Sequence, residues 1–310
     1  MATLSVVVSA WNEASTIDRC LNSISWADEI ILVDNQSSDQ TVAIARKYTR
    51  TIYHQPNNPM LNVNKNYGFT KASGDWILSL DADEEIPETL AGEIRSVVRQ
   101  NSKKTAPNDV VGYWIARKNI IFGKWIEHGL WWPDEQLRLF QRGKGKFPCV
   151  HIHEYLQVED KTSHLIEPYM HYNYTTVSQF IRKIDSLYTN DEVKRLLATG
   201  YTLSWYDALR FPLSDFVKIY FAQEGYKDGL HGLVLSMLQG MYSFIVFAKL
   251  WEAHGFGEQD VTLRVLEREF DHNSRELNYW KLTTQIKQSS DLIPRLWLKL
   301  KRRYGIHRNT

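Results

Sequence analysis

One stretch of the chain decides the fold class: Trp76-Ile77-Leu78-Ser79-Leu80-Asp81-Ala82-Asp83. Its largely apolar residues 76–80 form a run of strand length, which predicts a buried strand. The strand ends at two aspartates, and Pro87 follows, a residue favoured in the first turn of a helix. The stretch therefore predicts a strand, an acidic turn and a helix.

The same alternation of strand and helix precedes this stretch. Short apolar runs predict strands at 4–9, at 29–34 and near 51–53, and we expect helices at 16–24, between Asp39 and Lys47, and at 63–72. Strands that alternate with helices at this spacing form a mainly parallel sheet. We therefore predict an α/β fold.

The pattern changes along the chain. Further strands are expected at 111–121 and 136–140, but helical periodicity dominates after about residue 175. We predict an α/β catalytic domain over residues 1–175 and a helical region over 176–310. Residues 229–248 carry no Asp, Glu, Lys or Arg, yet their Gly, Ser and Gln content favours a buried or half-sunk interfacial helix over a transmembrane one.

The composition excludes several classes of protein. The 310 residues are 24% charged and 43% hydrophobic, as in folded globular proteins. Lys and Arg number 37 against 36 for Asp and Glu, and a net charge of +1 argues against a nucleic-acid partner. Six of the basic residues lie in the last sixteen positions, which contain no acid. The near-neutral total thus combines an acidic body with a basic tail.

The cysteines and the N-terminus indicate a compartment. We expect Cys20 and Cys149 to be two reduced thiols. The alternative is a single disulfide bridge between them. Residues 1–8 have no basic side chain and too short an apolar run for a signal peptide. We expect a cytoplasmic protein, or one on the cytosolic side of a membrane.

Polar clusters follow three of the predicted strands. They are Asn12-Glu13, residues 34–39 and residues 81–85. Ligands of open α/β sheets bind beyond the carboxyl ends of the strands, which is where all three clusters fall. Each cluster alone is equally consistent with a polar loop or a helix cap. Their shared position favours a ligand.

The Asp-x-Asp turn is the sharpest of these signals. Asp81 and Asp83 can hold Mg²⁺ or Mn²⁺, whose open positions accept phosphate oxygens. The sequence contains neither GxGxxG nor GxxxxGK[ST], so a diphosphate bound here would need a metal and basic side chains. Glu84 and Glu85 are explained by the first turn of the helix that Pro87 opens.

Other polar residues suit a nucleotide. Asp34 can accept the N–H of a uracil ring, and Asn12 or Glu13 can complete recognition of the base. Lys65 and Asn66 lie near the start of the helix before strand 76–80, where a cation can meet phosphate. The alternative for these two is ordinary polarity of a helix surface.

At this point the sequence resembles a known family. The motifs that carry the resemblance are Val6-Val7-Val8-Ser9-Ala10-Trp11-Asn12-Glu13, Val33-Asp34 with Ser37, Asp39 and Thr41, and Ala72-Ser73-Gly74-Asp75-Trp76 through Glu84. They resemble the inverting glycosyltransferases of family two, which have the GT-A fold. The resemblance implies a UDP-sugar donor, with Asn12, Glu13 and Asp34 on the nucleoside and Asp81 and Asp83 on the metal and diphosphate.

The second half is similar to one subgroup of that family. The matching segments are 112–114, 132–140, 150–154 and 220–232. They resemble the lipopolysaccharide-core β-1,4-glucosyltransferases and their relatives. The resemblance implies that the transferred sugar is a hexose, with glucose as the favoured candidate. It also implies that the acceptor is a membrane-anchored glycan such as lipopolysaccharide core or a lipid-linked saccharide.

Inverting transfer needs one general base for the acceptor hydroxyl. Asp134 is our first choice and Glu135 our second, because both lie in a loop before a strand. Arg138 can reach the diphosphate or orient the base, unless it only forms a salt bridge to a neighbouring acid. His153 is a candidate further ligand of the metal or phosphate, although a core or surface histidine is the alternative.

Aromatic and basic residues suggest two further contacts. Trp131 and Trp132, beside the candidate base, are placed near the acceptor, because flat rings suit the faces of sugars. Residues 294–304 place Leu296, Leu300 and Tyr304 on one helix face and cations around it, which is typical of a helix on an anionic membrane. A solvated basic tail is the alternative.

The sequence thus predicts a metal-dependent glycosyltransferase, peripheral on the cytosolic face of the inner membrane. Two other functions are alternatives. A phosphatase with Asp81 as nucleophile would want Thr or Val after the second aspartate, where Glu84 stands. A non-catalytic membrane scaffold would not need the acids at 34, 81, 83 and 134.

Overall fold

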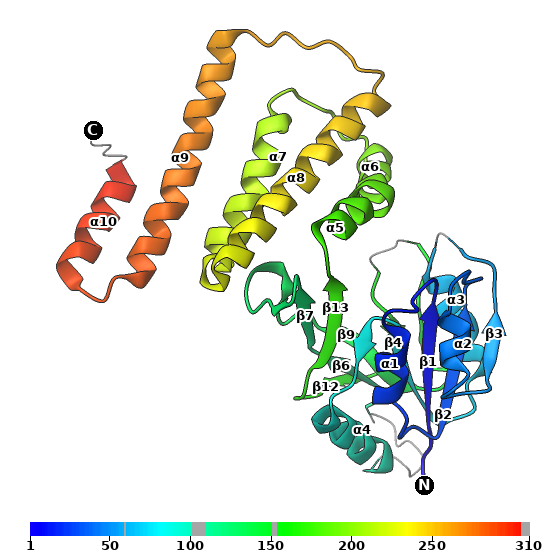
Figure 1. Cartoon of the computed structure of the whole chain (residues 1–310). Coiled ribbons are helices and arrows are strands. Elements are labelled where there is room, and N and C mark those ends of the chain that lie inside the picture. The colour runs from blue at the N-terminus through cyan, green and yellow to red at the C-terminus, as the bar shows by residue number, and fades with distance from the viewer. Residues whose placement is uncertain (59, 101–109, 151–153, 305–310) are drawn as a thin grey trace. The chain divides into compact units, whose positions relative to one another are not determined.

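The computed structural model describes the chain except for residues 59, 101–109, 151–153 and 305–310 (Figure 1). The chain divides into two compact units. The first comprises Met1–Trp125 and Trp131–Thr175, and the second comprises Ile126–Leu130 and Thr176–Thr310.

A seven-stranded sheet forms the centre of the first unit. Its strand order is β12-β6-β9-β4-β1-β2-β3. The strands are β1 (Leu4–Ala10), β2 (Glu29–Asp34), β3 (Ile52–His54), β4 (Trp76–Asp81), β6 (Gly112–Ile115), β9 (Gln136–Gln141) and β12 (Thr162–His164). Strands β1 to β4 pair in parallel and β9 runs antiparallel to both β4 and β6. The predicted mainly parallel sheet is confirmed.

Helices cover both faces of this sheet. They are α1 (Ile17–Ser23), α2 (Thr41–Ala45), α3 (Asn62–Lys71) and α4 (Glu88–Gln100). Side chains alternate along β1, so Val6 and Val8 belong to a core that includes residues of α1, α2 and α4. Val7 points to the other face and packs in a core with Phe69 of α3. Because both faces are covered, the strands are nearly continuous apolar runs.

The strand order creates a switch point between β1 and β4. The chain proceeds from β1 to β2 and β3 on one side, and then returns to place β4 on the other. Ligands of such sheets bind beyond the carboxyl ends of the strands at this point. In register, Ala10 pairs with Asp34 and Ser9 pairs with Asp81. The two aspartates therefore flank the end of β1.

A second, four-stranded sheet completes the first unit. Its order is β5-β13-β7-β8, with β5 (Glu84–Glu85), β7 (Arg117–Ile121), β8 (Lys124–Trp125) and β13 (Tyr169–Tyr174). A short hairpin-like pair, β10 (Gly145–Lys146) and β11 (Gln157–Val158), lies outside both sheets. The segment predicted as strand at 111–121 is divided, because β6 joins the large sheet and β7 joins the small one.

The second unit is helical. Its main helices are α5 (Val177–Lys183), α6 (Thr189–Ala198), α7 (Asp207–Val217), α8 (Leu230–Ala253), α9 (Leu263–Gln288) and α10 (Leu292–Tyr304). Helices α7 and α8 lie side by side (Figure 1). A Cβ on Gly240 would lie 3.0 Å from the carbonyl oxygen of Pro212, and the Ser243 hydroxyl donates to Asp215. Small side chains thus allow the close approach of these helices.

Helix α8 has two different faces. The face toward its neighbours includes buried Gly232, Ser236, Gly240 and Ser243, whereas large apolar side chains are exposed along the other: Leu230, Leu233, Met237, Met241, Phe244 and Trp251. By length and composition, α8 is the one helix in the described part of the chain that could cross a membrane. Core helices of soluble proteins pass the same test.

Two helical glycines provide a matched test of the packing. A Cβ on Gly68 in α3 would lie 2.5 Å from Cγ1 of Val7 and 2.8 Å from Cγ2 of Val33, whereas a Cβ on Gly92 in α4 meets nothing within 4 Å. We expect Gly68→Ala to lower the free energy of unfolding by about 1–3 kcal/mol through overpacking. Gly92→Ala should raise it by about 0.5–1 kcal/mol, because alanine favours the helix. Urea unfolding measures both, and equal changes would contradict this packing of α3.

Candidate active site

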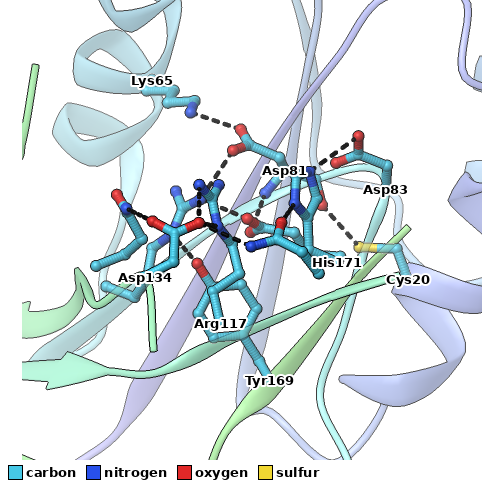
Figure 2. A network of polar contacts seen from close by, with 12 residues as sticks. Cys20, Lys65, Asp81, Asp83, Arg117, Asp134, Tyr169 and His171 are labelled. Atoms are coloured by element: carbon cyan, nitrogen blue, oxygen red, sulfur yellow. Dashed lines mark hydrogen bonds and ion pairs between the residues drawn. The ribbon is translucent and has the colours of Figure 1, made fainter. Parts of the chain in front are cut away.

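Asp81, at the end of β4, lies between two cations (Figure 2). Nζ of Lys65, from α3, lies 2.5 Å from its Oδ1, and Nη2 of Arg138, from β9, lies 2.9 Å from its Oδ2. Burial raises the pKa of this carboxyl, but Lys65 and Arg138 outweigh it and hold the pKa well below its ordinary range. Asp81 is therefore ionised and held on both oxygens.

Arg138 also forms a buried ion pair with Glu84. Its Nη2 lies 2.5 Å from Oε1 of Glu84, whose side chain is fully buried, and its Nε donates to the hydroxyl of Tyr169 at 3.3 Å. Burial raises the pKa of Glu84 although Arg138 opposes this. The prediction that Glu84 and Glu85 belong to a helical turn is wrong: both lie in β5, and α4 begins at Glu88. Strand pairing with β13 brings Glu84 inward.

Asp134 is held by donors from two directions. Nη2 of Arg117 lies 2.6 Å from Oδ2, and the amides of Asn119 and Gln136 donate to Oδ2 and Oδ1 at 2.8 Å and 3.0 Å. The backbone of Asp134 has a φ of 38°, in the left-handed region that non-glycine residues seldom adopt. Such conformations cluster at functional sites, where surrounding contacts maintain them.

A line of contacts joins Asp134 to the Asp-x-Asp turn (Figure 2). The amide nitrogen of Asn119 donates to Asp134 and to the carbonyl of Trp131, which fixes the amide oxygen toward His171. Nδ1 of His171 lies 2.7 Å from that oxygen and therefore carries the proton. Nε2 of His171 then faces Oδ2 of Asp83 at 3.5 Å.

The predicted nucleoside residues lie at the ends of β1 and β2. Asp34 is 2% exposed, and its carboxylate contacts Nδ1 of His54 at 2.8 Å and accepts the Ser37 N–H at 3.1 Å. Oδ1 of Asn12 accepts the Ser38 N–H at 2.8 Å. These bonds tie the loops after the two strands together.

Glu13 and Asn66 have clear structural partners. Oε2 of Glu13 accepts the Thr16 hydroxyl at 2.7 Å, directly before α1. The Asn66 amide exchanges two hydrogen bonds with the backbone of Phe147, at 2.8 Å and 2.9 Å. Of the pair predicted in α3, Lys65 therefore reaches Asp81, whereas Asn66 holds the segment around Phe147.

The side chains of the remaining predicted residues that the structure describes have other partners, and Trp131 joins the network only through its backbone carbonyl. Glu135 pairs with Nδ1 of His164 at 2.9 Å. Trp131 is 8% exposed, and the ring of Trp132 meets Trp125 edge-on at 5.4 Å. His153 lies outside the described residues.

A divalent metal fits one part of the site. Within the described ranges, no three His, Cys, Asp or Glu side chains are gathered as a preformed metal site requires. Mg²⁺, however, is often held by one or two carboxylates together with substrate phosphates. Asp83 and Asp81, with the His171 imidazole beside Asp83, suit an ion that arrives with a diphosphate.

Sequence reasoning missed Arg117, Asn119, Tyr169 and His171. They come in pairs two residues apart on β7 and β13, so each pair lies on one face of the small sheet. In β7 they belong to the polar run Arg117-Lys118-Asn119, and β13 reads Tyr-Met-His-Tyr-Asn-Tyr, so no alternation of polar and apolar residues marks them in the sequence. No linear motif connects them to Asp81 or Asp134.

Part of the chain matches a known protein family. Residues 5–156 match the model of glycosyl transferase family 2. They form a family 2 glycosyltransferase domain. The glycosyltransferase is 23% identical to the lipopolysaccharide core biosynthesis glycosyltransferase LpsC of Rhizobium meliloti, over 81% of this chain and 93% of that protein. An uncharacterized glycosyltransferase of Rickettsia felis is 26% identical, over 82% and 91%.

Among solved structures, TarS 1–349 of S. aureus is similar to this chain. It is 14% identical, covers 84% of this chain and 94% of its own, and has a TM-score of 0.40. The family match confirms the enzyme class predicted from the sequence, and the mainly parallel sheet with its covering helices confirms the predicted α/β fold class. The phosphatase and scaffold alternatives are set aside, and both oxygens of Asp81 are engaged by cations rather than presented as a nucleophile.

The depressed pKa of Asp81 predicts a pH dependence of stability. The folded-state pKa lies below the unfolded value, so the stabilisation is complete above about pH 4 and is lost as pH falls further. We expect the difference in unfolding free energy between wild type and Asp81→Asn to shrink by about 1.4 kcal/mol per pH unit below pH 4. Denaturant unfolding between pH 2 and 7 measures it. Parallel curves for the two proteins would contradict the ion pairs.

Proposed function

We propose that the protein transfers a hexose from a UDP-sugar to a hydroxyl of a membrane-anchored glycan, with inversion at the sugar carbon. Glucose is the favoured candidate for the hexose. The observation that carries the proposal is the line of contacts from Asp134 through Asn119 and His171 to Asp83. It links a candidate base to a candidate diphosphate site.

In this proposal the donor binds across the ends of β1, β2 and β4. Asp34, with Asn12 and Glu13 near it, receives the nucleoside, because its carboxylate lies at the end of β2 beside β1. Lys65 is 11% exposed and can meet the diphosphate directly. Arg138 is buried against Asp81 and Glu84, so it acts on the diphosphate through the position of Asp81.

Mn²⁺ or Mg²⁺ would be held by Asp83 and Asp81, with His153 as a further candidate ligand. When bound, the ion would neutralise charge that develops on the leaving diphosphate. The chain itself supplies the orientation of Asp81, through Lys65 and Arg138, and Nε2 of His171 lies beside Asp83 as a neighbouring acceptor.

Asp134 is the proposed base. Arg117 and Asn119 orient its carboxylate, which accepts the proton of the acceptor hydroxyl. Glu135 is less suited, because it pairs with His164 and is 43% exposed. The acceptor oxygen attacks the sugar carbon on the side opposite the diphosphate.

Transfer is tested with two variants. Asp83→Ala should abolish metal-dependent turnover of a UDP-sugar. Asp134→Asn should lower transfer by about 10²–10⁴-fold while leaving UDP-sugar affinity unchanged, because only the base is lost. Product formation with a panel of UDP-sugars, with and without Mn²⁺, measures turnover, and thermal shifts measure donor binding. Normal transfer by Asp134→Asn would contradict the assignment of the base.

We also propose that residues 176–310 attach the enzyme to the cytosolic face of the inner membrane. Helix α10 has no buried residue, and Leu296, Trp297 and Leu300 are each about half exposed among the cations of the tail. The exposed stripe of α8 adds apolar surface. The named role of the LpsC relative in lipopolysaccharide core biosynthesis supports a membrane-anchored acceptor.

Deleting residues 294–310 should weaken co-sedimentation with anionic liposomes, because it removes the basic apolar helix. The control is the triple variant Arg46→Gln, Arg50→Gln and Lys146→Gln, which removes three exposed cations from the first unit and should sediment like wild type. Unchanged binding of the deletion variant would overturn the role of α10.

A further inference from the structure

A hollow of about 360 Å³ adjoins the segment that carries Asp134. Its lining comprises Trp114, Pro133, Glu135, Tyr155 and His164. Pro133 and Glu135 are the two chain neighbours of Asp134. The volume falls within the range of small-molecule sites. None of these five residues belongs to the network around Asp81.

Three aromatic rings belong to the lining of the hollow. The Trp114 ring stacks on the imidazole of His164 at 6.4 Å and 22°, and lies 5.8 Å from the ring of Tyr155. The indole nitrogen of Trp114 donates to the Thr162 hydroxyl at 3.3 Å, which fixes its orientation. Tyr155 is 54% exposed although it is a large aromatic residue. Aromatic rings of this kind suit the C–H face of a sugar ring.

Polar atoms lie beside the aromatic rings. Oε1 of Glu135 and Nδ1 of His164 are 2.9 Å apart, and both side chains are substantially exposed, at 43% and 59%. A carboxylate next to an imidazole offers acceptors and a donor within the spacing of neighbouring hydroxyls. An apolar face with a polar edge is the combination that a hexose or heptose presents.

The place of the hollow in the sheet separates it from the donor residues. Trp114 lies on β6 and His164 on β12, whereas Asp34 ends β2 and Asp81 ends β4. In the strand order β12-β6-β9-β4-β1-β2, the start of β9 follows directly on Asp134 and Glu135. The candidate base therefore comes between the nucleotide side of the sheet and the hollow.

We propose that this hollow binds a sugar ring of the acceptor glycan, with Trp114 and Tyr155 against the ring face and Glu135 and His164 on its hydroxyls. The inference rests on the proposed transfer and adds the place and chemistry of acceptor recognition. Glu135 then binds the acceptor next to the base instead of acting as the base.

The test compares Tyr155→Ala with Tyr155→Phe and with Tyr48→Ala. Tyr48 lies after α2, and its hydroxyl donates to Asp18, outside the hollow. The probe is core oligosaccharide released from rough lipopolysaccharide, titrated calorimetrically in the presence of UDP. Tyr155→Ala and His164→Ala should weaken its binding about tenfold, because a ring face or a hydroxyl partner is lost. Tyr155→Phe and Tyr48→Ala should bind it as wild type does.

Separate outcomes overturn the inference and the function. Wild-type protein that binds UDP-sugar but not the oligosaccharide, or a Tyr155→Ala variant with wild-type affinity for it, overturns the acceptor hollow alone. Wild-type protein that neither binds nor turns over any UDP-sugar overturns the proposed transfer. For Glu135→Gln, a raised KM for the oligosaccharide with kcat retained supports the hollow. A collapse of kcat at unchanged KM overturns the placement of Glu135.

Discussion

The buried guanidinium of Arg138 is the interaction on which the rest of the site depends. It joins the end of β4, through Asp81, to β5, through Glu84, and itself belongs to β9. The seven-stranded and the four-stranded sheet of the first unit are therefore joined by one charged side chain. Removing one partner of a buried ion pair costs about 3–5 kcal/mol, because the other is left uncompensated in a poorly solvated place. Such a cation fixes geometry more than it adds stability.

The ion pairs of Arg138 with Asp81 and Glu84 explain how distant parts of the chain form one site. The large sheet contributes the Asp-x-Asp turn at its switch point, and the small sheet contributes Arg117, Asn119 and His171. Since Arg138 lies on the same strand that follows Asp134, its ion pairs also hold the start of β9 near β4. The candidate base and the candidate diphosphate site are thus positioned by a single strand.

Local pattern was enough to predict the parallel strands β1 to β4 of the large sheet, but not its edge strand β12. The run 29–34 became β2 without change, and 76–80 became β4 with Asp81 as its last residue. Apolar runs and parallel pairing depend on nearby residues, so the sequence reveals them. The inward turn of Glu84 and the contacts of His171 depend on pairing between β5 and β13, which are more than eighty residues apart. Spacing along the chain carries no record of that pairing.

The two oxygens of Asp134 are not equivalent. Oδ2 receives N–H groups from both Arg117 and Asn119, and neither a guanidinium nor this fixed amide can turn to accept a hydrogen bond. Oδ1 receives the Gln136 amide, which can rotate by half a turn and present its carbonyl instead. A proton transferred to this carboxyl is therefore accepted by Oδ1. Rotation of the Gln136 amide would let its carbonyl oxygen accept a hydrogen bond from the new O–H group.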